Sequence, residues 1–539
     1  MTEKRSIETS GEAEAGNSRT SLIAQGSVVA GMTLLSRISG LVRDIFLSYL
    51  LGSTQHADMF LVAFRIPNFF RRMFAEGAFS QSFIPVMTRY KLQGQAQLLA
   101  FLAPLTGLFT SGLIVFTVLG LLFAEPLTYL FAPGFAEHPD RLAETAELVR
   151  ITLPYLALIS LTAYAGALLN AHGRFAVPAG TPILLNLVLI GAALVAMANT
   201  GERSTIEILS WGVLAAGVVQ LLFQLPSLGR LGLVVFPSMD HRHEGIRRWL
   251  RLFGPALFAG SVSQINAVVN TILASTLITG SISWLYYADR LLELPVGLVA
   301  IALSTVMLPH LSRLAAEGNE AEFRGTLGWG INLGLMLGLP AALALYLLAD
   351  GLIATLFLSI GGSQMTVQDA RMAGYALQMF AVALPGFVLL RILAPAFYAH
   401  ENTKDPFRYA GIAVVANIVT SLATYTWFGH VGLAWATAVS AWTNVILLYA
   451  GLVRRGLFRI NQSLWGLFWR TIIACVVLAL ALWFYAVPIQ WLEIAAERRM
   501  LLMLLVCGVG GVGYLILLMV LGVRPRHLRQ YSARPTETV

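Results

Sequence analysis

The chain is short of charged residues and of cysteine. Only 12% of its 539 residues are Asp, Glu, Lys or Arg, 57% are hydrophobic, and the mean hydropathy is +0.73. Because only helices or closed barrels satisfy the backbone in lipid, this balance predicts a protein that crosses a membrane many times. The two cysteines, Cys475 and Cys507, lie in late apolar segments and predict neither a disulfide framework nor a metal site.

Signals of several soluble functions are also missing. The sequence has no Walker lysine loop, nucleotide-binding fingerprint or metal triad, which argues against ATP-driven work within this chain. The formal charge of +8 fits the bias of positive charge toward the cytoplasmic side of membrane proteins, so we expect no nucleic-acid partner. Residues 1–22 are polar and lack the short apolar core of a cleaved signal peptide, which predicts a disordered cytoplasmic tail.

Long, continuous apolar blocks are what the sequence does have. Strands of a membrane barrel would be short and alternating, so we expect an all-α polytopic membrane protein. Fourteen segments lie near residues 24–51, 57–85, 97–123, 146–169, 179–199, 206–228, 250–277, 284–311, 326–348, 372–399, 408–427, 432–452, 467–487 and 500–522.

The positive residues are distributed unevenly between the loops. With the amino end inside, the inner loops and tails hold 23 Lys and Arg residues, the outer loops hold five, and eight fall within the segments. This skew predicts an even number of crossings with both termini in the cytoplasm.

The chain also repeats itself at an offset of about 230 residues. A unit of six segments keeps its orientation when repeated, so two parallel, pseudo-symmetric six-helix lobes are expected, which is the layout of an alternating-access transporter. The matches are Ala57-Asp58 with Ala288-Asp289, Pro154 with Pro385, and Ala171-His172 with Ala399-His400. The expected parts are an N-lobe at 23–232, a C-lobe at 246–458, two extra helices at 465–523 and a cytoplasmic tail at 524–539.

Eight charged residues interrupt the apolar sequence between Ser36 and Pro85. A charge at mid-membrane costs about 2.5–3.5 kcal/mol on insertion scales, so we expect these side chains to line a wet cavity walled by protein. They are Arg37, Arg43, Asp44, Asp58, Arg65, Arg71, Arg72 and Glu76.

In the first segment, Ser36, Ser39, Gly40 and Arg43 recur at the spacing of one helical face, and Arg37 shares a neighbouring stripe with Asp44. Small residues beside an arginine leave room for a ligand. The alternative is that Arg43 and Asp44 lie near the outer membrane surface and snorkel into water.

In the second segment, Asn68, Arg71, Arg72 and Glu76 fall within a little more than two turns. Arg72 and Glu76 can neutralise each other at i, i+4, whereas Arg71 has no such partner in its own helix. Pro67 predicts a kink that suits a wall bending around a cavity.

The second half of the chain also carries charged residues in apolar segments. Asp289, Arg290 and Glu293 lie within one and a half turns, and Arg391 lies deep in the tenth segment. An internal pair between Arg290 and Glu293 is the alternative to a cavity role. Polar residues of the seventh segment suit either a cavity wall or bonds between helices. They are Ser261, Ser263, Gln264, Asn266 and Asn270.

The chemistry of these clusters favours an anionic cargo. Arginine stays charged, and its planar fork binds carboxylate or phosphate oxygens bidentately, whereas a cation exporter would bury an excess of Asp and Glu. Three kinds of protein remain as readings of these charges: a flippase for a lipid-linked glycan, a drug or cation antiporter, and a scaffold whose charges serve only packing.

The motifs SRISGLVRD, AFRIPNFFRRMFAEGAFSQSFIP and YYADRLLELP closely resemble the MurJ (MviN) family of bacterial lipid II flippases. The resemblance runs from about residue 22 to 525. It implies fourteen helices, with the last two forming a lipid-facing groove, and membership of the multidrug/oligosaccharidyl-lipid/polysaccharide exporter superfamily. It also implies a transporter rather than an enzyme, in the bacterial cytoplasmic (inner) membrane.

The cargo that the resemblance implies is lipid II, an undecaprenyl-diphosphate disaccharide-pentapeptide, moved from the inner to the outer leaflet. The substrate-binding residues that it implies, together with Ser36, are Arg37, Arg43, Arg71, Arg290, Asn68 and Ser283. Structural or coupling charges are expected at Asp44, Asp58, Arg72, Glu76, Asp289, Glu293 and Arg391, where Arg391 replaces a lysine of some members.

Some members of that family bind a sodium ion in the carboxy-terminal lobe, but no set of ligands in this sequence matches. We therefore assign no metal residue and expect no other cofactor. Membrane lipids and contacts with the peptidoglycan-synthesis machinery are the further expected partners, and a monomer is the expected state.

Overall fold

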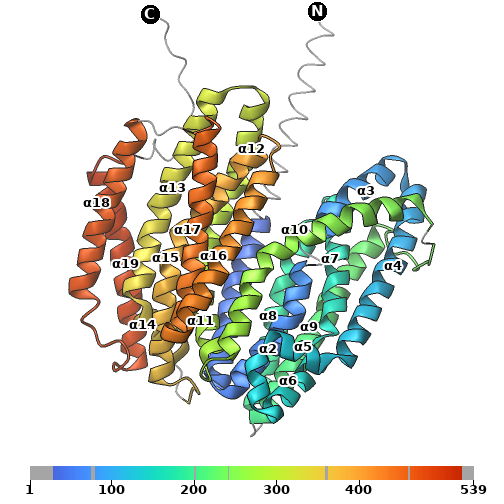
Figure 1. Ribbon diagram of the computed structural model, residues 1–539, viewed down its shortest axis with the longest axis horizontal. Helices are drawn as coiled ribbons and strands as arrows, with labels where there is room; N and C mark the ends of the chain where they lie inside the picture. The colour runs from blue at the N-terminus through green and yellow to red at the C-terminus, as the bar shows by residue number, and fades with distance from the viewer. Residues whose placement is uncertain are drawn as a thin grey trace, which may run out of the picture. The chain divides into compact units, whose positions relative to one another are not determined.

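The computed structural model describes residues 28–73, 79–198, 202–240, 242–358, 362–458 and 462–524. Within these ranges every regular element is helical and no strand occurs. Figure 1 shows the helices as bundles of long rods. The chain begins with a helix over residues 28–51. There follow α2 (Gln55–Arg71), α3 (Ser80–Leu92), α4 (Gln95–Leu122), α5 (Ala124–Phe131), η2 (Pro133–Glu137), α6 (Pro139–Thr152), α7 (Tyr155–Ala171), α8 (Ala176–Met197), α9 (Glu202–Arg230), α10 (Glu244–Ser275), α11 (Ser281–Pro295), η3 (Val296–Ala300), α12 (Ile301–Ala316), α13 (Glu320–Leu347), α14 (Ala349–Ile353), η4 (Ala354–Leu358), α15 (Val367–Tyr398), α16 (Lys404–Phe428), α17 (His430–Arg454), α18 (Gln462–Tyr485) and α19 (Ala496–Val520).

Ten stretches of the described chain are long and apolar enough to cross a membrane, and each coincides with one of the fourteen predicted segments. The predicted multi-pass all-α fold is confirmed. The other four predicted segments, 24–51, 57–85, 250–277 and 284–311, are also largely helical where the structure describes them. Two of them divide into helices of 13 to 17 residues, which are too short to belong to the apolar set. Most of the candidate site residues lie in these four segments.

Two of these polar segments are broken helices. The segment expected at 57–85 divides into α2 and α3, with π-helical turns at residues 72–73. The segment expected at 284–311 divides in the same way into α11 and α12, joined by the π-helical η3 directly after Pro295. Proline removes a helical donor, and π-turns widen the backbone, so the regular α-helical hydrogen bonding is interrupted next to charged residues in both segments.

The order of elements repeats along the chain. Helices α4 and α13 are both 28 residues long, and each is followed by a short helix. The turns after α7 and α15 are built alike: Nδ1 of His172 lies 2.8 Å from the Leu168 carbonyl oxygen, and Nδ1 of His400 lies 3.1 Å from that of Ala396. The two histidines are therefore equivalent turn residues, 228 positions apart.

One of the sequence matches is shifted in register. Asp58 lies in the first turn of α2, whereas Asp289 is eight residues beyond the start of α11. These helices begin at Gln55 and Ser281, so they are offset by 281 − 55 = 226 residues rather than 231. Pro154 lies inside the 33-residue span Pro139–Ala171, as Pro385 lies inside the 32-residue helix α15.

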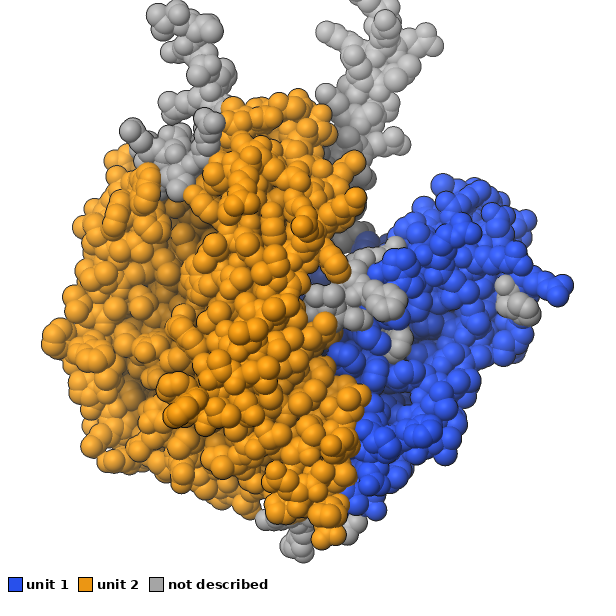
Figure 2. Space-filling model, in the orientation of Figure 1, with its two compact units in different colours: residues 1–46, 63–128, 143–261 blue, residues 47–62, 129–142, 262–539 orange. Residues whose placement is uncertain are grey.

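The chain forms two compact units, coloured separately in Figure 2. Unit 1 comprises residues 1–46, 63–128 and 143–261, and unit 2 comprises residues 47–62, 129–142 and 262–539. The core of unit 1 includes Phe79, Phe83, Phe101 and Trp249, all at most 2% exposed. The N-lobe and C-lobe boundaries predicted at 232 and 246 stay predictions.

Unit 2 has one core around α12, α13, α15 and α17 and another where α18 and α19 pack on α13. In the second, the Tyr514 hydroxyl of α19 donates to the Met336 carbonyl at 2.7 Å. Pro340 lies inside α13, four residues after Met336, and lacks the N–H that would have bonded this carbonyl. The tyrosine thus satisfies a backbone acceptor that proline leaves open, and the described outer faces of α18 and α19 are apolar and exposed.

Candidate functional site

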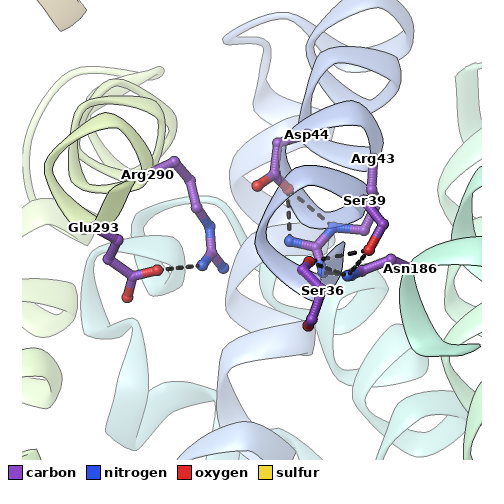
Figure 3. A network of polar contacts seen from close by, with 7 residues as sticks. All are labelled: Ser36, Ser39, Arg43, Asp44, Asn186, Arg290 and Glu293. Atoms are coloured by element: carbon purple, nitrogen blue, oxygen red, sulfur yellow. Dashed lines mark hydrogen bonds and ion pairs between the residues drawn. The ribbon is translucent and has the colours of Figure 1, made fainter. Parts of the chain in front are cut away.

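A polar network in unit 1 joins the helix over residues 28–51 to α8 (Figure 3). Arg43 donates through Nε and Nη2 to Asp44 Oδ1, at 3.0 and 2.7 Å, and through Nη1 to Asn186 Oδ1 at 3.0 Å. The Asn186 amide nitrogen donates to the Ser36 carbonyl at 3.0 Å and to the Ser39 hydroxyl at 2.9 Å. The predicted helical face of Ser36, Ser39 and Arg43 therefore faces one amide.

This network is enclosed by protein. Arg43 is 5% exposed, Asp44 1% and Asn186 5%. A buried guanidinium requires a partner charge and hydrogen bonds, and Asp44 and Asn186 supply both. Snorkelling to the surface is thus wrong for Arg43 and Asp44, and the guanidinium is held by side chains of its own unit rather than by open water. Gly40 lies beside this network, since a Cβ there would be in ordinary contact with the Asn186 amide nitrogen, at 3.5 Å.

Asn186 is the residue of this network that sequence analysis missed. It stands alone as an amide in the apolar stretch of α8, and a lone amide in such a stretch is a recognisable signal for a bond between helices. The signal does not identify the partner, which lies 143 residues earlier in the chain.

In α2, Arg71 Nε donates to Asn68 Oδ1 at 3.1 Å, and the Asn68 amide nitrogen donates to the Phe64 carbonyl at 2.8 Å. Arg71 thus has a neutral hydrogen-bond partner in its own helix, in place of the acidic partner expected for Arg72. Both side chains are partly exposed, and so is that of Arg37, while Arg72 is exposed. Glu76, and with it the expected Arg72–Glu76 pair, lies outside the described residues.

In unit 2, α11 carries a local ion pair (Figure 3). Arg290 Nη1 lies 2.9 Å from Glu293 Oε2, and the guanidinium carbon of Arg290 lies 4.8 Å from the Tyr286 ring centroid. The pairing expected as the alternative is therefore present. It is not sealed from solvent, because the Arg290 and Glu293 side chains are 26% and 40% exposed. Asp289 is partly buried on the same helix.

Ser283 is fully buried, and both its backbone N–H and its hydroxyl donate to Asp58 Oδ1, at 3.0 and 2.6 Å. Asp58 Oδ2 accepts from the Gly280 N–H at 2.8 Å and lies 3.4 Å from Arg141 Nη2. Asp58 thus caps the amino end of α11, and Ser283 belongs to this cap. The substrate-binding role of Ser283 stays a prediction.

Arg391 lies in α15, and its side chain is exposed. Arg141, at the start of α6, is 7% exposed and stacks on Phe135 at 3.9 Å from the ring centroid. The pairing of Arg141 with Asp58 could not be predicted from the sequence, in which the two residues are 83 positions apart.

A second polar group lies inside unit 2. The Asn266 amide nitrogen of α10 donates to the Ser440 hydroxyl of α17 at 3.3 Å, and Ser440 donates to the Ala413 carbonyl of α16 at 2.8 Å. The bonds between helices expected for the seventh segment are present at Asn266. The side chains of Ser261 and Ser263 lie outside the described residues.

Among the described residues, α10, α16 and α17 carry side-chain oxygens that are buried without a hydrogen-bond partner: those of Asn266, Asn270, Asn417, Ser421 and Asn444. Across the described ranges no group of three or more His, Cys, Asp or Glu residues could hold a metal ion. Neutral amide oxygens suit a hard cation that prefers oxygen ligands and exclude a soft metal that prefers sulfur. The donor chemistry therefore fits a sodium ion better than any transition metal.

Comparison with known proteins gives a consistent result. The family model described as "Lipid II flippase MurJ" matches residues 47–500. The chain is 39% identical over 518 residues to a "Probable lipid II flippase MurJ" of Vibrio cholerae, covering 94% of this chain and 98% of that protein. It is 36% identical over 477 residues to the "Lipid II flippase MurJ" of Burkholderia cenocepacia, covering 87% of this chain and 91% of that protein.

Solved structures agree on the fold. "Lipid II flippase MurJ, inward closed conformation" is similar with a TM-score of 0.76 and 25% identity, over 91% of this chain and 98% of that one. An inward-facing multidrug resistance transporter of the MATE family is similar with a TM-score of 0.57 and 15% identity, over 80% of this chain and 97% of that one. The second likeness concerns the fold alone.

Proposed function

The chain belongs to the MurJ family of lipid II flippases, and from that premise we propose that it moves lipid II from the inner to the outer leaflet of the bacterial cytoplasmic membrane. We further propose that both termini are cytoplasmic, that the chain acts as a monomer, and that it contacts the peptidoglycan-synthesis machinery. Its role is transport, without a catalytic step on the lipid.

Arg290 is the observation that carries the proposed headgroup binding. It is permanently charged, lies on an apolar helix and is one-quarter exposed. Glu293 and Tyr286 hold its guanidinium in one orientation, which lowers the entropy lost when a diphosphate binds. A diphosphate oxygen would replace water at the exposed part of the fork, while the polyprenyl tail remains in lipid. Arg37, Arg71 and Asn68, which are partly exposed in unit 1, are the proposed further ligands.

Arg43 is proposed to act in a different way. Its buried bonds to Asp44 and Asn186 fix the helix that also carries Ser36 and Arg37. In this arrangement Arg43 positions the neighbouring residues, and direct contact with substrate requires that the network open. Arg391, which is exposed on α15, is proposed to supply a further positive charge.

Alternating access is the proposed mechanism, and the broken helices are its proposed bending points. Helices α2 and α11 each end at a π-turn next to charged residues, so a change of direction there moves the arginines without unfolding a continuous helix. The membrane potential contributes about 2.3 kcal/mol per elementary charge per 100 mV, which can help to return the empty carrier.

We propose that Asn266, Asn270 and Asn417 would hold a sodium ion. Bound there, the ion would coordinate amide oxygens that have no hydrogen-bond partner among the described residues, and it would link α10 to α16. Adding sodium chloride to a sodium-free sample and measuring the thermal midpoint tests this site independently of transport.

Two other cargoes are compatible with the arginines: another polyprenyl-diphosphate glycan, or a drug or cation exchanged by a transporter of the same fold. The deciding experiment depletes a bacterium of its own flippase, supplies this chain, and measures lipid II at the outer face by its accessibility to an externally added enzyme. Restored exposure of lipid II supports the proposal. Normal insertion of the chain with lipid II retained in the inner leaflet overturns it.

A further inference from the structure

The connection between α9 and α10, in unit 1, exposes apolar side chains in an unusual pattern. Figure 1 shows it beside α4. The extended backbone alternates: Leu233 is 3% exposed and Val235 is half-buried, whereas Val234 is 60% and Phe236 95% exposed. Successive side chains of an extended segment point to opposite sides, so one side packs on the core of unit 1 and the other faces outward. The outward side chains are apolar, and exposing them to water alone would be unfavourable.

The segment is firmly mounted on α4. The Ser238 N–H donates to the Ala103 carbonyl at 3.1 Å, and the Ser111 hydroxyl lies 3.6 Å from the Met239 sulfur. At Gly107, a Cβ would meet the Ser238 backbone at a distance that no side chain tolerates, so the absence of a side chain lets the two backbones approach. The contact of the Ser238 backbone with α4 therefore fixes the outward direction of the nearby Phe236 side chain.

Basic residues follow immediately. At the start of α10, Ile246 and Trp249 are at most 2% exposed and anchor the helix in the core of unit 1. The opposite face carries Arg247, Arg248 and Arg251, all exposed, with exposed Leu250 and Leu252 between them. Residues 230–252 contain five arginines and only two acidic residues, Asp240 and Glu244.

We propose that residues 230–240 and 242–252 form a binding surface for anionic phospholipid. Apolar side chains that enter the headgroup and acyl boundary, next to exposed arginines, are the two features of a segment that lies in the interface of an anionic leaflet. Phe236 and Met239 enter the boundary, and the arginines bind lipid phosphates. The arginine bias of the loops assigns this surface to the cytoplasmic leaflet. The inference does not rest on the identity of the transported lipid.

The position of Phe236 is tested with the full chain. Cys475 and Cys507 are replaced by serine, Phe236→Cys is labelled with an environment-sensitive dye, and the protein is placed in phosphatidylcholine nanodiscs. The matched control is Glu317→Cys, at an exposed position of unit 2. We expect the dye at 236 to be quenched by nitroxide-labelled lipid and shielded from iodide, with the reverse at 317. A dye at 236 that iodide quenches as at 317, or that neither quencher reaches because protein covers it, overturns the proposal.

Lipid selectivity is tested by titrating the detergent-solubilised chain with phosphatidylglycerol or phosphatidylcholine. The variant is Arg247→Gln/Arg248→Gln/Arg251→Gln, and the control of equal charge change is Arg174→Gln/Arg408→Gln/Arg498→Gln, at scattered exposed positions. One arginine near an anionic surface changes affinity about fivefold, so the clustered variant should lose at least about tenfold in phosphatidylglycerol affinity. The scattered variant should lose clearly less. Equal losses in the two variants, or inorganic phosphate displacing the lipid completely, contradict the proposal.

Discussion

Asp58 holds Ser283 by two bonds to a single carboxylate oxygen: the serine N–H at 3.0 Å and its hydroxyl at 2.6 Å. Both residues belong to unit 2, where the carboxylate of α2 caps the first turn of α11. Since α11 carries Arg290, the direction of that arginine depends on a cap provided more than 200 residues earlier. Ser283, predicted to bind substrate, thus takes part in the support of the helix that carries Arg290.

The first prediction concerns this cap. Asp58→Ala leaves the donors of Gly280 and Ser283 without an acceptor and strands the buried Arg141 guanidinium. Breaking a buried ion pair by removing one partner costs about 3–5 kcal/mol, so the thermal midpoint in detergent should fall strongly. Asp140→Ala, at an exposed carboxylate, is the control and should leave the midpoint unchanged. A midpoint for Asp58→Ala equal to that of the control would show that the cap contributes nothing.

The second prediction concerns the Tyr514–Met336 bond. Tyr514→Phe should destabilise the protein by about 0.6–1.7 kcal/mol, because such bonds between helices in membranes contribute that much and the carbonyl loses its donor. Adding Pro340→Ala should reduce the cost, because the new N–H of residue 340 can bond the Met336 carbonyl within α13. Thermal unfolding of the two single variants and the double variant measures this coupling. Strictly additive effects would refute it, and Tyr485→Phe, at an 83% exposed position, is the control.

The third prediction concerns sodium. If Asn417 is a ligand, sodium chloride should raise the thermal midpoint above that in choline chloride of equal concentration, because an ion that binds only the folded state stabilises it. Asn417→Leu should abolish this difference, whereas Asn170→Leu, at an exposed amide of unit 1, should retain it. If the Asn417→Leu variant keeps the same difference in thermal midpoint between the two salts, the ion does not bind at Asn417.

The sequence predicts the ten apolar crossings well, because a run of about 18 or more apolar residues rarely occurs outside a helix that spans a bilayer. It predicts a kink at Pro67 in the second segment but not the π-helical turns that break the second and eighth segments. The shared face of Ser36, Ser39 and Arg43 follows from helical periodicity alone.

The partners of the charged residues could not be predicted in this way. Arg43 meets Asn186 across 143 residues, and Tyr514 meets Met336 across 178. Such pairs depend on how helices pack, and a single sequence does not contain that information. The local pair of Arg290 with Glu293 could be anticipated, because i, i+3 neighbours on a helix are close in any fold.

The most direct measurement of the proposed headgroup binding is lipid II exposure in flippase-depleted cells carrying Arg290→Ala. The matched control is Arg313→Ala, which also removes the arginine of a local helical pair in unit 2 but at a site where its side chain is 60% exposed. The proposal predicts that Arg313→Ala restores lipid II at the outer face and that Arg290→Ala, inserted to the same level, restores at most about one-tenth as much, since a lost charged hydrogen bond costs about 1.5–3 kcal/mol. Equal exposure of lipid II with both variants would contradict a role for Arg290 in binding the diphosphate.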